Sequence, residues 1–298
     1  MNYLKPLTSQ ALNRFLSKEP TFAPEVLRSR PEVPRVSVVV PSFNQKDFLQ
    51  RCLRSIIHQA YPNLEIIVMD GGSSDGSKEV LEAYSPYLTY WRSERDRGQS
   101  HALNEGFARA TGDILAYLNS DDLYLPTAPL QKVVDAFDRR PEIDILHGHA
   151  YLIDENDRIF GFAASLPWST PNYHDGIFCI PQCASFWRRR VWQKVGAFNE
   201  TNRSCMDGEF YLEADRQGSR FEVLPAMTAA FRIHSSSITG SGRLAQQYAA
   251  DQARLREEYA RQRSSNWEQL QRRLEARLLR LGTAYRFHPR LTLKGDTL

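Results

Sequence analysis

Ile114-Leu115-Ala116-Tyr117-Leu118-Asn119-Ser120-Asp121-Asp122 reads as a buried strand that runs directly into acidic residues. Residues 114–118 are apolar and long enough for a short strand. In α/β proteins, side chains at the carboxyl end of a strand lie at the sheet edge where ligands bind. Adjacent carboxylates repel each other unless a cation or hydrogen-bond donors compensate them. The pattern therefore indicates either a Mg²⁺ or Mn²⁺ site or the capped start of a helix.

Strand-like and helix-like segments alternate on the amino-terminal side of this stretch. Val36-Ser37-Val38-Val39-Val40, residues 64–69 and residues 88–91 are predicted strands, and apolar residues at helical spacing predict helices between them. This alternation is typical of an α/β fold with a mostly parallel sheet flanked by helices. The polar residues that follow the strands, and would gather at one sheet edge, are Asn44, Asp70, Asp75, Asp96, Asn119, Asp121 and Asp122.

Length and composition limit the class of protein. The 298 residues suffice for one α/β domain with appendages, and a formal net charge of +3 does not argue for nucleic acid. The four cysteines form no Cys-x-x-Cys pair and, without a secretory signal, predict reduced thiols in a cytoplasmic protein. No apolar run approaches the roughly 18 residues that span a bilayer. Neither a Gly-x-Gly-x-x-Gly after the first strand nor a P-loop is present, which argues against dinucleotide and ATP sites.

Several motifs, taken in order, resemble glycosyltransferase family 2. They are Val38-Val39-Val40-Pro41-Ser42-Phe43-Asn44, Asp70-Gly71-Gly72-Ser73-Ser74-Asp75-Gly76, Arg97-Gly98-Gln99-Ser100 through Phe107, Asn119-Ser120-Asp121-Asp122, and shorter matches at 195–200, 206–210 and 231–234. The resemblance covers about residues 35 to 240. It implies the GT-A (Rossmann-like) fold and an inverting enzyme that moves a sugar from a nucleotide-diphospho-sugar, usually with Mn²⁺ or Mg²⁺. Asp70 at its strand end makes a UDP-sugar the expected donor.

The resemblance also implies roles for individual residues. The implied nucleotide contacts are Pro41, Ser42, Asn44, Asp70, Asp96, Asn104, Asn119, Ser120 and Arg232. Asp121 and His234 would hold the metal, and Asp207 would be the general base, although Asp207 could equally be a helix N-cap. On the acceptor side stand Gln182, Trp187 and Asp122, with core packing as the alternative for Trp187.

This chain departs from the family pattern at three positions. Asn119 stands where many relatives have an acidic residue, so the site has one negative charge fewer. Leu103 stands where many have an arginine, so the phosphate charge must be met elsewhere, and Arg232 is the expected substitute. Met206 replaces the acidic residue that often precedes the base. These departures leave a catalytically silent nucleotide-sugar-binding scaffold as an alternative, beside a sugar-phosphate nucleotidyltransferase.

We expect three regions. Residues 1–35 are an extension with a short helix and a Pro-rich connector, residues 36–242 the GT-A domain (nucleotide-sugar half 36–125, acceptor half 126–242), and residues 243–298 a basic helical extension. In this extension Leu270, Leu274, Leu278 and Leu281 form an apolar stripe among arginines. The extension would pack on the domain or lie peripherally on the inner face of a membrane, which suits a glycan or lipid-linked acceptor. The sequence does not specify the sugar, the acceptor, the linkage or the oligomeric state.

Overall fold

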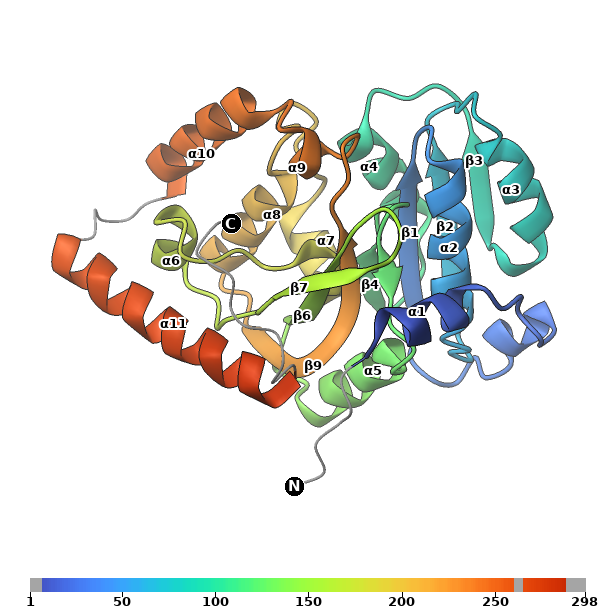
Figure 1. Cartoon of the computed structure of the whole chain (residues 1–298), viewed down its shortest axis with the longest axis horizontal. Helices are drawn as coiled ribbons and strands as arrows, with labels where there is room; N and C mark the ends of the chain where they lie inside the picture. The colour runs from blue at the N-terminus through green and yellow to red at the C-terminus, as the bar shows by residue number, and fades with distance from the viewer. Residues whose placement is uncertain (1–6, 260–264, 288–298) are drawn as a thin grey trace.

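The computed structural model describes residues 7–259 and 265–287 (Figure 1). Within them, nine strands form one sheet in the order β3-β2-β1-β4-β8-β6-β9-β5, with β7 paired to β6. The strands are β1 (Val36–Ser42), β2 (Leu64–Asp70), β3 (Tyr90–Ser93), β4 (Ile114–Tyr117), β5 (Leu123–Tyr124), β6 (Ile145–Ile153), β7 (Ile159–Ala163), β8 (Ser185–Arg188) and β9 (Phe221–Arg232). Strands β3, β2, β1 and β4 run parallel, as do β6 and β9, whereas β8, β5 and β7 pair antiparallel. The predicted α/β class is confirmed.

Helices cover both faces of this sheet (Figure 1). They are α1 (Ser9–Leu16), α2 (Lys46–Ile57), α3 (Ser77–Tyr84), α4 (Gln99–Arg109), α5 (Pro129–Arg139), α6 (Thr170–His174), α7 (Arg189–Val195), α8 (Met206–Arg216), α9 (Ile238–Ser241), α10 (Ala245–Tyr259), α11 (Asn266–Phe287) and the 3-10 turns η1 (Pro24–Arg28), η2 (Ser85–Tyr87) and η3 (Gln182–Ala184). The predicted amino-terminal helix is α1, and the part of that prediction before residue 7 lies outside the described residues. Residues 177–181 contain no strand, and the short strand β8 follows the 3-10 turn η3.

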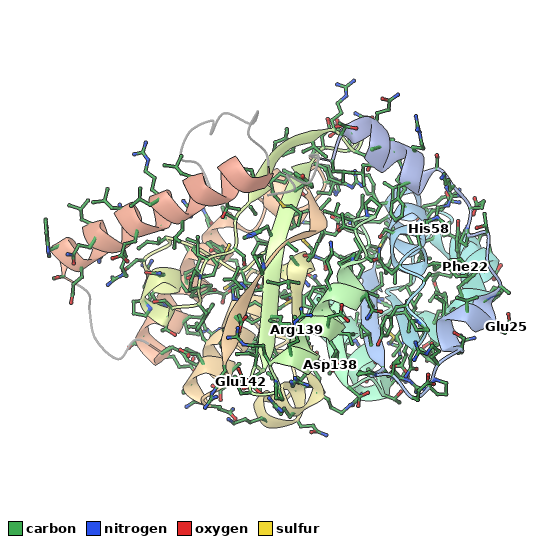
Figure 2. The ribbon with its side chains drawn as sticks, turned by 90° about the horizontal axis from the view of Figure 1, so that it is seen from below. Phe22, Glu25, His58, Asp138, Arg139 and Glu142 are labelled. Atoms are coloured by element: carbon green, nitrogen blue, oxygen red, sulfur yellow. The ribbon has the colours of Figure 1, made fainter. Side chains whose placement is uncertain are left out.

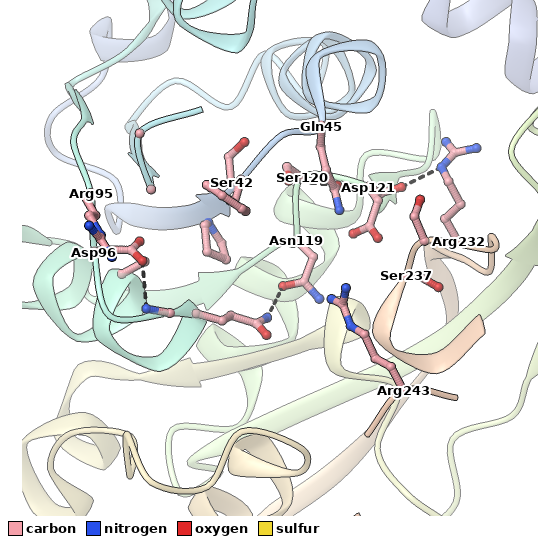
Figure 3. Close-up of a pocket in the computed structure, with 18 of the residues that line it drawn as sticks. Ser42, Gln45, Arg95, Asp96, Asn119, Ser120, Asp121, Arg232, Ser237 and Arg243 are labelled. Carbon is pink, nitrogen blue, oxygen red and sulfur yellow. Dashed lines mark hydrogen bonds between the residues drawn. The ribbon is translucent and has the colours of Figure 1, made fainter. Parts of the chain in front are cut away.

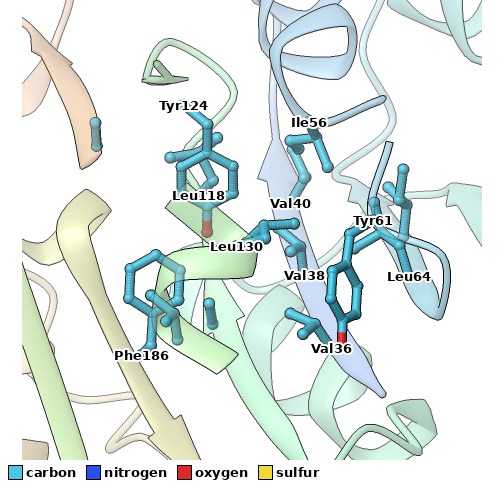
Figure 4. Packing of buried hydrophobic residues seen from close by; sticks show 14 of the residues in the cluster. Val36, Val38, Val40, Ile56, Tyr61, Leu64, Leu118, Tyr124, Leu130 and Phe186 are labelled. Atoms are coloured by element: carbon cyan, nitrogen blue, oxygen red, sulfur yellow. The ribbon is translucent and has the colours of Figure 1, made fainter. Parts of the chain in front are cut away.

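Strand β1 lies at the centre of the core because both of its faces are covered. Val38 and Val40 pack with the apolar side of α2 (Figure 4). Val39 packs with α4 on the opposite face. Gly106 lets α4 approach closely, since a Cβ there would lie 2.4 Å from a methyl group of Val39. Because helices cover both faces of β1, its side chains on both faces must be apolar. This explains the continuous apolar run in the sequence.

The register of the parallel strands brings their polar ends together. Ser42 at the end of β1 lies beside Asp70 at the end of β2, and β4 pairs with β1 from Val36 and Ile114 onward. The loops after β1, β2 and β4 therefore open on one edge, as the sequence pattern predicted. The residues that follow β4, Asn119 to Asp122, meet the loop after β1 at this edge.

Helix α10 packs against the domain through polar contacts. Arg254 forms a salt bridge of 2.8 Å with Glu209 of α8, and Ser204 donates a hydrogen bond of 2.6 Å to Asp251. Much of the predicted extension after residue 243 is thus joined to the helix that carries Asp207. In the described ranges, none of the helices is both long and apolar enough to cross a membrane.

Candidate active site

A pocket of about 740 Å³ opens at the edge where β1, β2 and β4 end (Figure 3). It is lined by Pro41, Ser42, Phe43, Gln45, Gly71, Gly72, Arg95, Asp96, Gly98, Gln99, Ala102, Asn119, Ser120, Asp121, Phe231, Arg232, Ser236, Ser237 and Arg243. The volume falls in the range of small-molecule and cofactor sites. Seven of the predicted site residues line it: Pro41, Ser42, Asp96, Asn119, Ser120, Asp121 and Arg232.

Asp121 and His234 face each other at the acidic end of the pocket. Nε2 of His234 lies 3.2 Å from Oδ2 of Asp121, and Nδ1 lies 2.9 Å from the hydroxyl of Ser236. The ring packs on Phe48 with centroids 4.7 Å apart. Either Nε2 donates directly to Asp121, or Nδ1 donates to Ser236 and both the Nε2 lone pair and the Asp121 oxygen are available to a cation. A hydrogen bond at the second ring nitrogen is what orients metal-binding histidines in proteins.

The Asp121 carboxylate and the His234 ring nitrogen fit a divalent ion whose remaining ligands would be phosphate oxygens of a bound nucleotide. Mg²⁺ in particular uses one or two carboxylates plus substrate oxygens and water, so a complete protein cage is not required. Across the described ranges no group of three or more His, Cys, Asp or Glu side chains converges.

Arg232 corrects the expectation drawn from Leu103. Arg232 is 1% exposed. Its guanidinium donates to the carbonyls of Asp121 (2.8 Å) and Asp154 (2.6 Å) and to the carboxylate of Asp157 (2.6 Å). It also stacks over the ring of Phe48 at 4.7 Å. Because three acceptors already hold this guanidinium, it positions the Asp121 backbone and is not the main phosphate ligand.

The loop residues Asp70 and Asn44 are engaged by their own loops. Asp70 is buried and accepts hydrogen bonds from the amide and hydroxyl of Ser73 (2.9 and 2.5 Å) and from the hydroxyl of Ser93 (2.6 Å). The side chain of Asn44 accepts from the amide of Ser74 at 2.9 Å. Both side chains shape the wall formed by residues 71–74, and neither lines the pocket.

Hydrogen-bonded amide side chains connect the pocket lining to Gln182, a predicted acceptor-side residue that is buried and does not line the pocket. Gln99 donates to Oδ1 of Asn119 at 2.6 Å, and Asn119 in turn lies 3.5 Å from the side-chain oxygen of Gln182. Ser120 donates to Gln45 at 3.1 Å. Gln45 and Gln99 are pocket residues that the sequence reasoning missed. Gln99 could have been found, since it follows Gly98 in one of the family-like motifs.

Three further predicted site residues lie away from the pocket. Trp187 is fully buried and packs against Phe107 and Phe210, with ring centroids 5.5 and 5.2 Å apart, so no sugar can stack on it. Asp122 is buried behind Asp121 and is not open to an acceptor; burial and then the charge of Asp121 raise its pKa. Asn104 exchanges hydrogen bonds of 2.9 and 2.8 Å with the backbone of Phe198 and so holds α4 in place.

Asp207 lies in the first turn of α8, where it makes no ion pair with the described residues. The N-cap position belongs to Cys205, so Asp207 is not the cap itself. Burial raises the pKa of Asp207, although its side chain keeps some exposed surface.

Two arginines of the pocket were not anticipated. Arg95 and Arg243 line it, and neither forms an ion pair with another described residue. Arg243 lies between α9 and α10, and its side chain reaches from that loop toward the centre of the pocket (Figure 3). No motif in the sequence marks this residue, which stands at the border of the predicted extension.

Comparisons with known proteins address the family and the fold of this chain. The model of the family described as glycosyl transferase family 2 matches residues 37–193. An uncharacterized glycosyltransferase of Mycobacterium tuberculosis is 34% identical over 185 residues, which are 61% of this chain and 69% of the relative.

Two solved structures share the fold. Staphylococcus aureus TarS in complex with UDP-GlcNAc aligns with a TM-score of 0.61 at 17% identity, over 85% of this chain and 73% of that one. The mannosyltransferase PcManGT from Pyrobaculum calidifontis, in complex with GDP-Man and Mn²⁺, aligns with a TM-score of 0.57 at 19% identity, over 94% and 78%. These likenesses confirm the GT-A architecture. Together with the family match over its central half, they establish that the chain is a glycosyltransferase and belongs to glycosyltransferase family 2.

Proposed function

We propose that this glycosyltransferase moves a sugar from a nucleoside-diphospho-sugar, preferably a UDP-sugar, to a hydroxyl of a glycan or lipid-linked acceptor with inversion. The observation that carries the proposal is the carboxylate of Asp121, which lines a pocket of about 740 Å³ and faces the buried ring of His234 outside that lining. The carboxylate of Asp207 also lies outside the lining and forms no ion pair with the described residues. The pair suits the departing diphosphate, and the carboxylate suits removal of the acceptor proton. The match to glycosyltransferase family 2 argues against the alternative of a sugar-phosphate nucleotidyltransferase.

A turnover screen tests this proposal. UDP-, GDP- and dTDP-sugars would be offered with Mn²⁺ or Mg²⁺, and sugar release and transfer would be measured. Slow hydrolysis of one donor class is expected even without an acceptor. Binding of nucleotide without any turnover would instead support the silent scaffold.

The nucleotide would bind at the Pro41–Ser42 end of the pocket. Ser42 is 6% exposed, and its hydroxyl has no hydrogen-bond partner among the described residues, so a ligand would satisfy it. Asp96 lines the same region and uses Oδ1 to accept the amide of Gly98 at 2.7 Å. In this arrangement Asp96 is the carboxylate that can accept the uracil N3–H, and Asp70 holds the adjoining wall.

UDP is accordingly expected to bind more tightly than GDP. A pyrimidine presents its N3–H donor where a larger purine would not match, and dTDP shares this edge. Asp96→Asn is expected to weaken UDP binding by about tenfold, the typical effect of losing a hydrogen bond to a charged group. Titration calorimetry with UDP, dTDP and GDP measures both effects. GDP binding at least tenfold tighter than UDP would contradict this assignment.

Asp121 and His234 would hold the divalent ion, which supplies charge neutralisation to the leaving diphosphate. In the protein itself, Ser236 orients the His234 ring, and Arg232 fixes the Asp121 backbone through its carbonyl. The negative charge that Asn119 lacks relative to many family members would be made up by the nucleotide phosphates.

Arg243 is expected to neutralise the diphosphate charge, because Leu103 has no charge and Arg232 is held by other acceptors. A guanidinium forms charge-assisted hydrogen bonds to phosphate oxygens, so Arg243→Ala should weaken UDP binding by about tenfold. Uridine, which lacks phosphate, should bind the variant and the parent equally. Arg139→Ala is the matched control, because Arg139 is an exposed arginine at the end of α5, outside the pocket. An equal loss for uridine would show that Arg243 acts on the shape of the pocket instead.

A further inference from the structure

Helix α11 lies along the outer margin of the molecule (Figures 1 and 2). Its large apolar side chains are exposed. Its inward contacts are polar or small: Ala276 is 3% exposed, Arg272 pairs with Asp175, and Arg280 donates to the carbonyl of Ile177. This is the reverse of a helix that packs on a hydrophobic core, where the apolar stripe faces inward.

The outward side carries a row of large apolar side chains. We call Trp267, Leu270, Leu274, Leu278 and Leu281 the apolar row; they are 66%, 48%, 54%, 69% and 42% exposed. At 3.6 residues per turn these residues share one face, and Ala276 lies about 160° from its middle. Soluble monomers rarely expose a continuous apolar strip of this kind, so the row indicates a contact surface.

The charges of α11 distinguish between possible partners. The helix has five arginines and two glutamates. Arg273 and Arg277 border the apolar row on one side and form no ion pair within the described chain. Of the glutamates, Glu268 accepts hydrogen bonds from Ser265 at the start of the helix, and Glu275 lies on the other side of the row. The surface that complements an apolar row bordered by unpaired arginines is itself apolar with negative groups beside it.

We propose that the apolar row of α11 docks on the surface of an anionic lipid bilayer. The leucines and Trp267 enter the boundary between headgroups and acyl chains, while Arg273 and Arg277 contact lipid phosphates. The helix spans about 33 Å, long enough to hold the domain in a fixed orientation on the bilayer. Docking would place the enzyme beside a lipid-linked acceptor, and it goes beyond the proposed transfer reaction because binding needs no turnover.

Vesicle co-sedimentation of the full chain tests the proposal. Phosphatidylcholine vesicles with phosphatidylglycerol should retain the parent at low salt, and vesicles of phosphatidylcholine alone should retain little. The double variant Leu274→Glu, Leu278→Glu should abolish retention. Arg273→Gln and Arg277→Gln should each weaken it by about fivefold, which corresponds to the known contribution of one basic residue near such a surface.

Leu279→Glu is the matched control, because Leu279 is 50% exposed on the same helix but lies about 140° from the middle of the apolar row. Its retention should equal that of the parent. Loss of retention with Leu279→Glu as large as with the double variant would overturn the proposal, as would no retention of the parent. Light scattering tests the alternative that a second copy of the chain covers the apolar row. In that case the parent would form dimers and would not bind vesicles, and the double variant Leu274→Glu, Leu278→Glu would be monomeric. This result would also overturn the proposal. Unchanged donor hydrolysis in the double variant separates this proposal from the proposed function.

Discussion

Asp207→Asn is expected to slow turnover at least about a hundredfold, within the range that general-base catalysis contributes. The base must take the proton of the acceptor hydroxyl as that oxygen attacks the anomeric carbon. Asp207 suits this role because it forms no ion pair and because burial raises its pKa, so the carboxylate is a stronger base than an exposed aspartate. An amide of the same shape cannot accept the proton. Nucleotide-sugar binding should stay at the level of the parent.

The same substitution should leave the fold as stable or make it more stable. A carboxyl whose pKa is raised by burial costs stability as pH increases from the ordinary aspartate range through the raised pKa, because the unfolded chain ionises first. Asparagine removes that cost at neutral pH. In the parent, turnover should fall with decreasing pH at a value above about 3.9, the pKa of an unperturbed aspartate. Thermal unfolding and a pH–rate profile measure these two effects.

Asp215→Asn is the matched control, since Asp215 lies on the same helix and accepts a hydrogen bond of 2.6 Å from Thr170 away from the pocket. It should turn over like the parent. If Asp207→Asn stayed within a few-fold of the parent, Asp207 would not be the base, and Glu209 would be the next candidate. Glu209 is less suited, because the salt bridge to Arg254 and hydrogen bonds from Asn202 and Asn199 lower its pKa despite burial.

Asp121→Ala is expected to abolish turnover and to remove any tightening of UDP binding by Mn²⁺. Asp121 is the carboxylate of the pocket that faces His234, and without it the cation has no protein oxygen at the acidic end. UDP titrations with and without Mn²⁺, alongside donor hydrolysis, measure both effects. His234→Ala should weaken both less, because the carboxylate supplies the negative charge that a hard cation prefers.

Asp138→Ala provides the comparison for this experiment, since Asp138 is an exposed aspartate of α5 outside the pocket (Figure 2). It should keep full turnover and full Mn²⁺ dependence. Full activity of the parent in EDTA would exclude the metal role. In that case Arg243 and Arg95 would have to neutralise the diphosphate without an ion.

The sequence alone was sufficient for the class of the fold and the edge at which the site lies. Val38, Val39 and Val40 form a continuous apolar run, and only a strand covered on both faces explains such a run near helices. The acidic residues follow the strands within a few positions, and parallel strands end on the same side. These inferences rest on local patterns, which a single sequence displays directly.

The tertiary structure alone decided how individual side chains are used. Arg232 is held by Asp157 and by the carbonyl of Asp121, 75 and 111 residues away, so no local pattern could show that its guanidinium is occupied. Trp187 is buried by Phe107 and Phe210, which come from two different helices. Arg243 lines the pocket because β9 pairs with β5, which places the loop after β9 at the sheet edge where the pocket lies.

The orientation of α11 shows the same limit. Its spacing of leucines indicated an amphipathic helix, but spacing is unchanged when a helix rotates about its axis. Contacts of Arg272 with Asp175 and of Arg280 with Ile177 fix that rotation, and both partners lie about a hundred residues earlier in the chain. Local periodicity thus determined which residues share a face, whereas long-range hydrogen bonds and ion pairs determined where each face points.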